Sequence, residues 1–299
     1  MMKSHTRARL GFKSIQANRL RFMALWVLFI SSIIITVPLS IHGEQRDWLD
    51  IPYANLSGNQ KLDISLPTSG NGPFPVIVSI HGGGFVTGDK RMVVAVPVRG
   101  YAVVAVNYRL CGEAKFPSQI HDIKAAIRWI RANAKTYHLN PDKIAVWGES
   151  AGGYLAALAG TSGDVKELED LGLGNPEESC RVQAVVDWFG PIDSIMSDLY
   201  FLESIFLGKK IKDNPGIIKT TDPQTFISPD DPPFFIQHGT ADKSVPVEQS
   251  INFATQLKKV LGKDKVTLDL LKGARHADAM FSSWDNLNKV LDFLDKYMK

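Results

Sequence analysis

The chain has 299 residues, of which 44% are hydrophobic and 22% are charged, and its formal net charge is +3. This composition excludes an intrinsically disordered chain and a collagen-like repeat, because enough apolar residues are present to form a core. The first 43 residues contain six Lys or Arg and no acidic residue, which leaves 28 basic against 31 acidic residues in the remainder. We therefore expect no nucleic-acid partner.

The N-terminal segment combines those basic residues with an apolar run over residues 22–41. This order is typical of an export signal, and a run of about twenty residues is also long enough to span a bilayer as a helix. Residues 1–43 are thus expected to be an export signal or an uncleaved membrane anchor, with a misassigned start codon as a third alternative. The first two place the remainder outside the cytoplasm, either periplasmic or secreted, or anchored through residues 22–41.

From residue 44 onward, strand-like and helix-like segments alternate. Leu62, Ile64 and Leu66 alternate with polar residues, which predicts a half-buried strand. Apolar runs rich in Val and Ile, typical of strands covered on both faces, follow at 75–80, 101–106, 144–147, 182–189, 234–236 and 266–271. Apolar spacing predicts helices from 118 until Asn140-Pro141, and at 150–159, 247–261 and 284–297. The alternation predicts an α/β fold with a mostly parallel, doubly wound sheet, in one domain over residues 44–299.

One segment, residues 193–231, interrupts this alternation. It is too long for a simple connection and contains several aromatic residues. We expect it to be a small cap insertion over a pocket.

The two cysteines, Cys111 and Cys180, are candidates for a disulfide in an oxidising compartment. In the predicted fold one follows the carboxyl end of a strand and the other precedes the start of a parallel strand, which puts them about 15–20 Å apart. A disulfide requires Cα atoms within about 7 Å. Two free thiols are expected unless the Cys111 loop folds back.

A candidate nucleophile lies where the run 144–147 leads into Gly148-Glu149-Ser150-Ala151-Gly152 and then into a helix. In a Gly-x-Ser-x-Gly turn the strained serine displays its hydroxyl at the helix N-terminus. The flanking glycines are needed because those two positions nearly touch. The placement between a buried strand and a helix supports Ser150 as the nucleophile.

A serine hydroxyl is a weak nucleophile and requires a base, which in turn requires an orienting acid. Downstream of Ser150 only His238 and His276 remain. His276, on the loop after the last strand, is the predicted base, whereas His238 ends a strand and is expected to be structural.

The predicted acid is Asp242, on the loop after the penultimate strand. Glu149, Asp187 and Asp193 are rivals, but Glu149 adjoins the serine and the other two flank an earlier strand. The order of serine, aspartate and histidine along the chain is the one expected of an α/β-hydrolase.

An oxyanion site is predicted from His81-Gly82-Gly83-Gly84, which follows the run 75–80. The backbone N–H groups of Gly83, Gly84 and Ala151 are the expected donors. A phosphate-binding glycine loop is the alternative, but the downstream Lys-Ser/Thr is missing. Phe85, Trp188 and Phe189, with residues 200–206, are candidate pocket residues or plain core. Metal and cofactors are not expected, because the histidines and the two cysteines lack ligand spacing.

With these residues in place, the chain from about residue 50 resembles the α/β-hydrolase superfamily and, within it, esterases related to hormone-sensitive lipase. The motifs that carry the resemblance are His81-Gly82-Gly83-Gly84, Asn107-Tyr108-Arg109-Leu110, Gly148-Glu149-Ser150-Ala151-Gly152-Gly153 and His238-Gly239-Thr240-Ala241-Asp242. Residues 185–191 and the compact size look most like bacterial carboxylesterases that deacetylate or deferuloylate plant polysaccharides.

The resemblance implies hydrolysis of short-chain esters through an acyl-enzyme, with a small-molecule or polysaccharide ester as substrate. The histidine loop departs from the usual Gly-His-Gly, since Arg275 and Ala277 flank His276. Arg275 either binds an acidic substrate group or reaches solvent. A serine peptidase of the prolyl-oligopeptidase type and a non-catalytic binding protein on a hydrolase scaffold are the alternatives.

Overall fold

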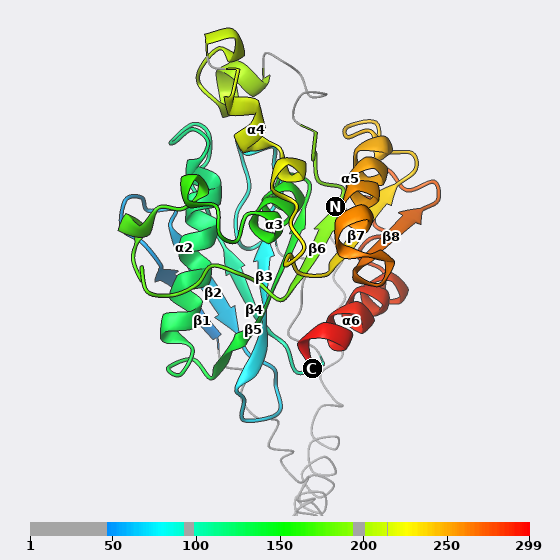
Figure 1. Ribbon diagram of the computed structural model, residues 1–299. Helices are drawn as coiled ribbons and strands as arrows, with labels where there is room; N and C mark the ends of the chain where they lie inside the picture. Colours follow the sequence, from blue (N-terminus) through cyan, green and yellow to red (C-terminus); the bar gives the residue numbers. More distant parts are fainter. Residues whose placement is uncertain (1–46, 93–98, 194–200, 214) are drawn as a thin grey trace, which may run out of the picture. The chain divides into compact units, whose positions relative to one another are not determined.

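The computed structural model describes residues 47–92, 99–193, 201–213 and 215–299 (Figure 1). All of them belong to one compact unit, Gly43–Lys299. The predicted export signal or anchor at residues 1–43 lies outside the described residues and stays a prediction. Within the described residues, we find no helix with the length and apolar character needed to cross a membrane.

Among the residues that the structure describes, eight strands form a single sheet in the order β1-β2-β4-β3-β5-β6-β7-β8. Strand β2 pairs antiparallel with β1 and with β4, and every other neighbouring pair is parallel. The bounds are β1 Asp47–Pro52, β2 Lys61–Ser65, β3 Phe74–Ile80, β4 Ala102–Val106, β5 Leu139–Glu149, β6 Ala184–Trp188, β7 Phe234–Gly239 and β8 Val266–Leu271. The predicted α/β fold with a mostly parallel sheet is confirmed.

Four long helices occupy the positions predicted from the apolar spacing. They are α2 Ser118–Asn133, α3 Ala151–Thr161, α5 Val247–Leu261 and α6 Trp284–Met298. Helix α2 ends earlier than expected, because Asn140-Pro141 lies inside β5 rather than closing the helix. Proline is tolerated near the start of a strand, where its missing N–H removes no central ladder bond.

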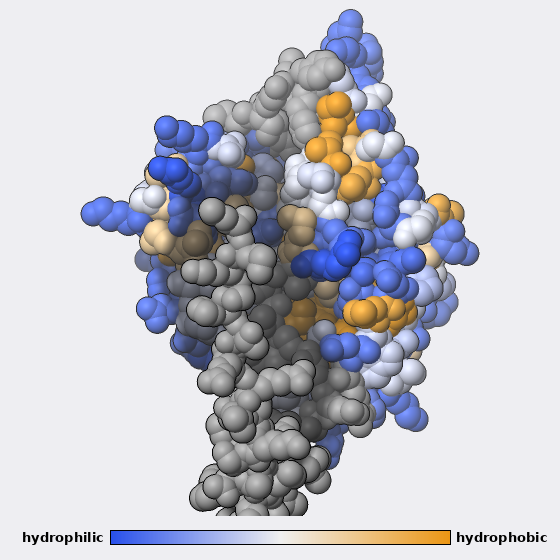
Figure 2. Space-filling view, turned by 180° about the vertical axis from the view of Figure 1, so that it is seen from behind, coloured by the Kyte–Doolittle hydropathy of each residue, from blue (hydrophilic) through white to orange (hydrophobic). Residues whose placement is uncertain are grey.

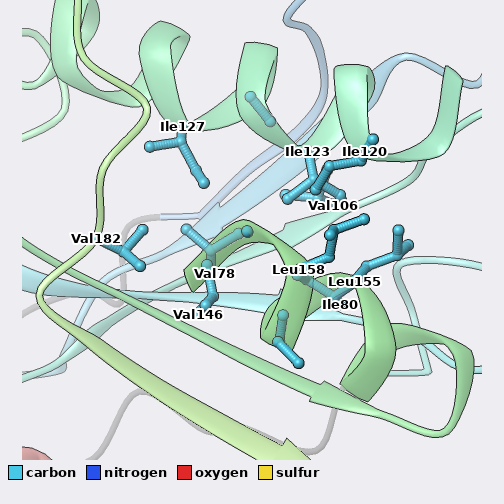
Figure 3. Packing of buried hydrophobic residues seen from close by; sticks show 14 of the residues in the cluster. Val78, Ile80, Val106, Ile120, Ile123, Ile127, Val146, Leu155, Leu158 and Val182 are labelled. Atoms are coloured by element: carbon cyan, nitrogen blue, oxygen red, sulfur yellow. The ribbon is translucent and has the colours of Figure 1, made fainter. Parts of the chain in front are cut away.

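The helices cover both faces of the sheet, and the strands alternate between them with period two. Val76 and Val78 of β3 pack in one cluster with residues of α2, α3 and α5, whereas Ile77 packs with residues of α6. Figure 3 shows the first cluster, in which Ile123 of α2 lies near the side chains of α3 and the sheet. Burial on both faces explains why these strands are continuous apolar runs.

The surface of the described residues is mainly hydrophilic on the face shown in Figure 2, where hydrophobic side chains lie in small groups among hydrophilic ones. Exposed apolar side chains such as Leu49 and Trp284 occur on most folded proteins and do not mark a site by themselves.

The insertion at residues 193–231 contains short elements in its described part. They are η4 Phe201–Phe206, η5 Ile211–Asp213, α4 Ile217–Thr221 and η6 Pro223–Phe226. Figure 1 shows α4 at the end of the sheet where the parallel strands terminate. The backbone N–H of Phe116 donates to the carbonyl of Phe206 at 3.0 Å, which ties the insertion to the loop before α2.

Both cysteines are buried and free, so the expected pair of free thiols is confirmed. The thiol of Cys180 donates to the carbonyl of Gly163 at 3.2 Å and is 3.1 Å from a carboxylate oxygen of Glu169. Burial raises the pKa of each thiol to about 11. Neither thiol is therefore activated for nucleophilic chemistry near neutral pH.

Candidate active site

Ser150 occupies the turn between β5 and α3 with φ 51° and ψ −119°. A non-glycine residue held in such a conformation costs about 1–3 kcal/mol, which the surrounding packing must supply. A Cβ atom on Gly148 would lie 2.0 Å from the carbonyl oxygen of Gly152, and one on Gly152 would lie 2.1 Å from that of Ile80. Both glycines are thus required by close backbone approach, and the turn projects the serine hydroxyl from the end of the sheet.

Ser150, Asp242 and His276, which were predicted from separate loops, lie next to one another in the structure. Nε2 of His276 lies 2.9 Å from Oγ of Ser150, and Nδ1 lies 2.6 Å from Oδ2 of Asp242. Because a carboxylate only accepts hydrogen bonds, Nδ1 carries the imidazole proton. Nε2 is left to accept the proton of the serine hydroxyl, which is the arrangement a general base requires.

The carboxylate of Asp242 is fully buried and is held on both oxygens. Its Oδ1 accepts hydrogen bonds from the backbone N–H groups of Ser244 at 2.8 Å and Val245 at 2.9 Å. Burial raises the pKa of Asp242, but the N–H of Val245, the ring of His276 and the N–H of Ser244 outweigh it, so the net pKa lies below its ordinary value. The group is therefore ionised at neutral pH and faces the imidazole as an anion.

His238 lies behind the carboxylate, with its side chain fully buried. Its Nε2 is 3.0 Å from the carbonyl oxygen of Val245 and 3.3 Å from Oδ2 of Asp242, and its Nδ1 is 2.7 Å from Oγ of Ser250. Burial lowers the pKa of His238, which keeps the ring neutral. The ring lies near the same carboxylate oxygen that His276 contacts and is held by its own hydrogen bonds, as expected of a structural histidine.

Two of the rival acids, Asp187 and Glu149, belong to strands β6 and β5. Asp187 is fully buried on β6, and its Oδ1 accepts the N–H of Gly190 at 3.0 Å. Burial raises its pKa to about 7. Burial also raises the pKa of Glu149, which adjoins the serine on β5. Asp242 is the acid that meets Nδ1 of His276.

Of the three predicted oxyanion donors, two line the pocket at Ser150 and one does not. Gly84 and Ala151 line the same pocket as Ser150. Gly83 is not among the lining residues; its φ is 104°, and a Cβ there would lie 2.1 Å from the carbonyl oxygen of Thr87. Its own carbonyl accepts the N–H groups of Val86 and Thr87, both at 3.1 Å. Gly83 shapes the loop, and Gly84 and Ala151 present backbone to the pocket.

The motif at 107–110 supports this loop, a role that the sequence did not reveal. The hydroxyl of Tyr108 donates to the carbonyl of His81 at 3.1 Å, and the two rings stack with centroids 4.5 Å apart. The guanidinium of Arg109 is anchored on the fully buried Asp122 at 2.7 Å. A side chain that acts only by buttressing another loop leaves no local sequence pattern from which that contact can be inferred.

A pocket of about 190 Å³ opens at Ser150. Its other lining residues are Gly84, Phe85, Ala151, Tyr154, Pro191, Leu202, Phe206, Ser244, Val245 and His276. The predicted Phe85 is among them, and Leu202 and Phe206 show that the insertion contributes to the wall. Sequence analysis missed Tyr154, although it lies one helical turn beyond Ser150, a spacing that places two residues on one helix face.

Trp188 and Phe189 do not line this pocket, so the pocket role proposed for them is wrong and the alternative, plain core, holds. Both are buried in the cluster on the α6 side of the sheet, where their rings pack against Phe281. The ring of Phe189 also contacts that of His276, with centroids 4.8 Å apart. These aromatic side chains therefore form the packing behind the histidine.

Metal ligation has no candidate site within the described residues, where no group of three or more His, Cys, Asp or Glu is placed to hold an ion.

The chain is similar to several proteins that are named esterases. Residues 62–257 match the model of the BD-FAE family. Esterase LipQ of Mycobacterium tuberculosis is 32% identical over 76% of the chain, and the chain spans only 56% of the length of LipQ.

Solved structures of similar fold include two esterases that match along most of their length. A truncated carbohydrate esterase from gut microbiota superposes with a TM-score of 0.78 at 31% identity, over 85% of this chain and 97% of that one. Esterase 2 of Thermogutta terrifontis has a TM-score of 0.67 at 26% identity, over 86% of this chain and 92% of that one. It has also been solved with propionate and with butyrate bound.

The sheet order, the strained serine turn and these matches confirm the predicted resemblance to the α/β-hydrolase superfamily. Because the family match spans residues 62–257, most of the described chain, the protein belongs to the BD-FAE family.

Proposed function

We propose that the chain is a serine carboxylesterase that hydrolyses short-chain esters through an acyl-enzyme. The observation that carries the proposal is the continuous hydrogen-bonded series from Asp242 through His276 to Ser150, beside a pocket lined by Gly84 and Ala151. The similarity to proteins named esterases and carbohydrate esterases supports the same reaction class.

In the first half of the reaction, Nε2 of His276 takes the proton of the Ser150 hydroxyl as Oγ attacks the ester carbonyl. The carbonyl electrons move to oxygen, and the resulting oxyanion accepts hydrogen bonds from the backbone N–H groups of Gly84 and Ala151. When the oxyanion collapses, the alcohol oxygen leaves with the proton held by His276. In the second half, water repeats these steps on the acyl-enzyme and releases the acid.

The role of Asp242 is to hold the imidazole with its proton on Nδ1 and to stabilise the imidazolium that forms in the transition state. The lowered pKa of Asp242 keeps it charged through the cycle. The backbone N–H of Gly83 is proposed as a third donor to the oxyanion, and its positive φ also sets the course of the loop before Gly84.

The size of the pocket favours small acyl groups. Its volume is about 190 Å³, and Phe85, Tyr154, Leu202 and Phe206 form much of its wall. Each buried methylene contributes about 0.8 kcal/mol, so kcat/KM should rise about fourfold per carbon until the pocket is full and then fall. The propionate and butyrate complexes of the Thermogutta terrifontis esterase support acyl groups of this length.

The physiological ester is proposed to be an acetyl group on a plant polysaccharide, with a feruloyl ester as the second candidate. The similarity to a carbohydrate esterase from gut microbiota supports a saccharide substrate. The compact pocket favours acetyl over the much bulkier feruloyl group.

Hydrolysis of 4-nitrophenyl esters of increasing acyl length tests this function. We expect the highest kcat/KM between acetate and butyrate, and no activity above background in a Ser150→Ala variant. An optimum at dodecanoate or beyond would contradict the pocket assignment. Cleavage of prolyl peptides with no ester hydrolysis would instead favour the peptidase alternative.

The place of action is proposed to be outside the cytoplasm, in the periplasm, in the medium or at the membrane surface. The basic residues that precede the apolar run 22–41 support this proposal. Fractionation of cells that express the full chain, followed by mass spectrometry of its N-terminus, distinguishes a cleaved signal from a retained anchor. Recovery of the intact chain in the cytoplasm alone would contradict both.

A further inference from the structure

A second pocket, of about 550 Å³, adjoins the candidate base. It is lined by Ala241, Lys243, Ser244, Arg275 and His276. It shares His276 and Ser244 with the pocket described above, but Ser150, Gly84 and Ala151 line only that first pocket. The first pocket has mostly apolar lining residues, whereas the lining of the second includes two cationic side chains.

The chemistry of ester cleavage decides which half of a substrate each pocket receives, and this step rests on the proposed esterase function. The carbonyl carbon must meet Oγ of Ser150 while its oxygen meets the amides of Gly84 and Ala151, so the acyl half occupies the smaller pocket. The leaving oxygen must meet Nε2 of His276 to receive its proton. The alcohol half therefore extends past His276 into the larger pocket.

That larger pocket carries two exposed cations, Lys243 and Arg275. No ion pair found in the described part of the chain includes either of them. Two acids lie on the same loops. Asp242 is buried on His276 and backbone amides, and Asp278 accepts the backbone N–H groups of Arg275 at 3.2 Å and Met280 at 3.1 Å.

Neither acid lines the pocket, so its wall presents two positive side chains and no carboxylate. Hydrogen bonds from the backbone N–H groups of Met280 and Arg275, and to a smaller extent the charge of the Arg275 guanidinium, lower the pKa of Asp278, so this carboxylate partly offsets that cation. A cationic wall beside the leaving-group position attracts an alcohol that bears negative charge.

We propose that Lys243 and Arg275 form a subsite for a carboxylate on the alcohol half of the ester. Combined with a saccharide substrate, this means that the preferred acetyl group is carried by, or lies beside, an acidic sugar. A guanidinium matches a carboxylate with two parallel hydrogen bonds, and the ammonium of Lys243 adds a second donor from the facing loop.

The test compares two acetate esters that differ in one exocyclic group, which is neutral in the first and anionic in the second. They are the monoacetates of a methyl glucoside and of the corresponding methyl glucuronide, in which the exocyclic hydroxymethyl group is replaced by a carboxylate. Acetate release gives kcat/KM for each. For two solvent-accessible charge pairs we expect the wild type to favour the glucuronide about fivefold at low ionic strength, and less as salt is added.

The ratio of the two kcat/KM values, measured within each variant, is the readout. A Lys243→Gln and Arg275→Gln double variant should bring the ratio close to one, with each single variant in between. Lys272→Gln is the matched control: this exposed lysine lies on the same loop as Arg275 but outside the pocket lining, and its ratio should match the wild type.

A wild-type ratio of one or less, or a ratio that the double variant leaves unchanged, would overturn the subsite. Hydrolysis of 4-nitrophenyl acetate but of neither sugar acetate would also overturn it while leaving the esterase function intact. If 4-nitrophenyl acetate is not hydrolysed either, the proposed function is itself wrong and the subsite with it.

Discussion

Replacing Asp242 with Asn tests the site most informatively, because the contacts of the two carboxylate oxygens differ. Oδ1 accepts two backbone N–H groups, whereas Oδ2 faces Nδ1 of His276 and lies 3.3 Å from Nε2 of His238. The amide oxygen of Asn can satisfy only one of these sides. If it takes the place of Oδ1, its NH₂ group faces His276, and the imidazole must turn to the tautomer with the proton on Nε2.

In that tautomer Nε2 no longer accepts the proton of the serine hydroxyl, and the base is lost. The reverse orientation restores the tautomer but points the NH₂ group at the N–H groups of Ser244 and Val245. The partly buried N–H of Val245 costs about 1–3 kcal/mol when it loses its acceptor, whereas the exposed N–H of Ser244 can turn to water. The active arrangement is then populated about 5- to 160-fold less, and we expect kcat/KM of Asp242→Asn to fall by the same factor.

The assay is hydrolysis of 4-nitrophenyl acetate, with the thermal unfolding midpoint measured to show that the variant is folded. Asp278→Asn is the matched control, because Asp278 lies two residues beyond His276 and contacts only backbone groups of its own loop among the hydrogen bonds found in the described residues. It should retain activity within about threefold of the wild type, as expected of a substitution away from the chemistry. Retention of more than half of the activity by folded Asp242→Asn would refute the reasoning.

Three further substitutions are expected to give separable results. Gly152→Ala places a methyl group against the carbonyl of Ile80, so it should abolish activity or lower the unfolding midpoint by several degrees, as thermal unfolding and ester assays would show; an unaffected variant would contradict the close packing. Phe206→Ala should move the acyl-length optimum to longer esters, with about a fourfold gain in relative kcat/KM per added methylene, and an unchanged optimum would remove Phe206 from the pocket wall. Burial raises the pKa of Asp187 from 3.8 to about 7, so the folded state keeps a proton that the unfolded state loses, and stability falls as pH rises through that window. Asp187→Asn cannot ionise and should lose less stability than the wild type between about pH 4 and pH 7 in thermal scans, whereas parallel curves would contradict a buried, protonated carboxyl.

Most of the sheet could be predicted from the sequence because a strand buried on both faces has to be apolar throughout. The edge strand β1 has four exposed residues among its six, and it therefore left no apolar pattern to detect. The motif Asn140-Pro141 was wrongly interpreted as the end of a helix. A proline at the start of a strand and one beyond a helix look alike when only local sequence is considered.

The candidate site could likewise be predicted only in part. Ser150 and the loops of Asp242 and His276 are each tied to the end of a strand, and parallel strands bring such ends to one edge of the sheet. No comparable rule predicts which residues line a pocket. Trp188 has the same side-chain type as a pocket residue, but it shares the face of Val186, two residues earlier, which packs against α6. The alternation of side chains along the strand can be read from the sequence, and it would have placed Trp188 in the core.

The remaining wall residues depend on contacts between distant segments. Phe206 meets Phe85 with ring centroids 4.6 Å apart, and Tyr154 donates its hydroxyl to the carbonyl of Thr221 at 2.7 Å. These contacts fix the insertion over the serine turn, and no periodicity within either segment encodes them. The expected cap was placed by its length and composition, while its individual wall residues required the tertiary structure.

Covalent labelling with a fluorophosphonate, followed by peptide mass spectrometry, tests the central claim most directly. If His276 activates the Ser150 hydroxyl beside the amides of Gly84 and Ala151, the adduct will form on the peptide that contains Ser150. Labelling should be lost in Ser150→Ala and strongly slowed in a folded His276→Ala variant. An unmodified Ser150 peptide in active, folded protein, or equal labelling with and without the imidazole, would contradict the account.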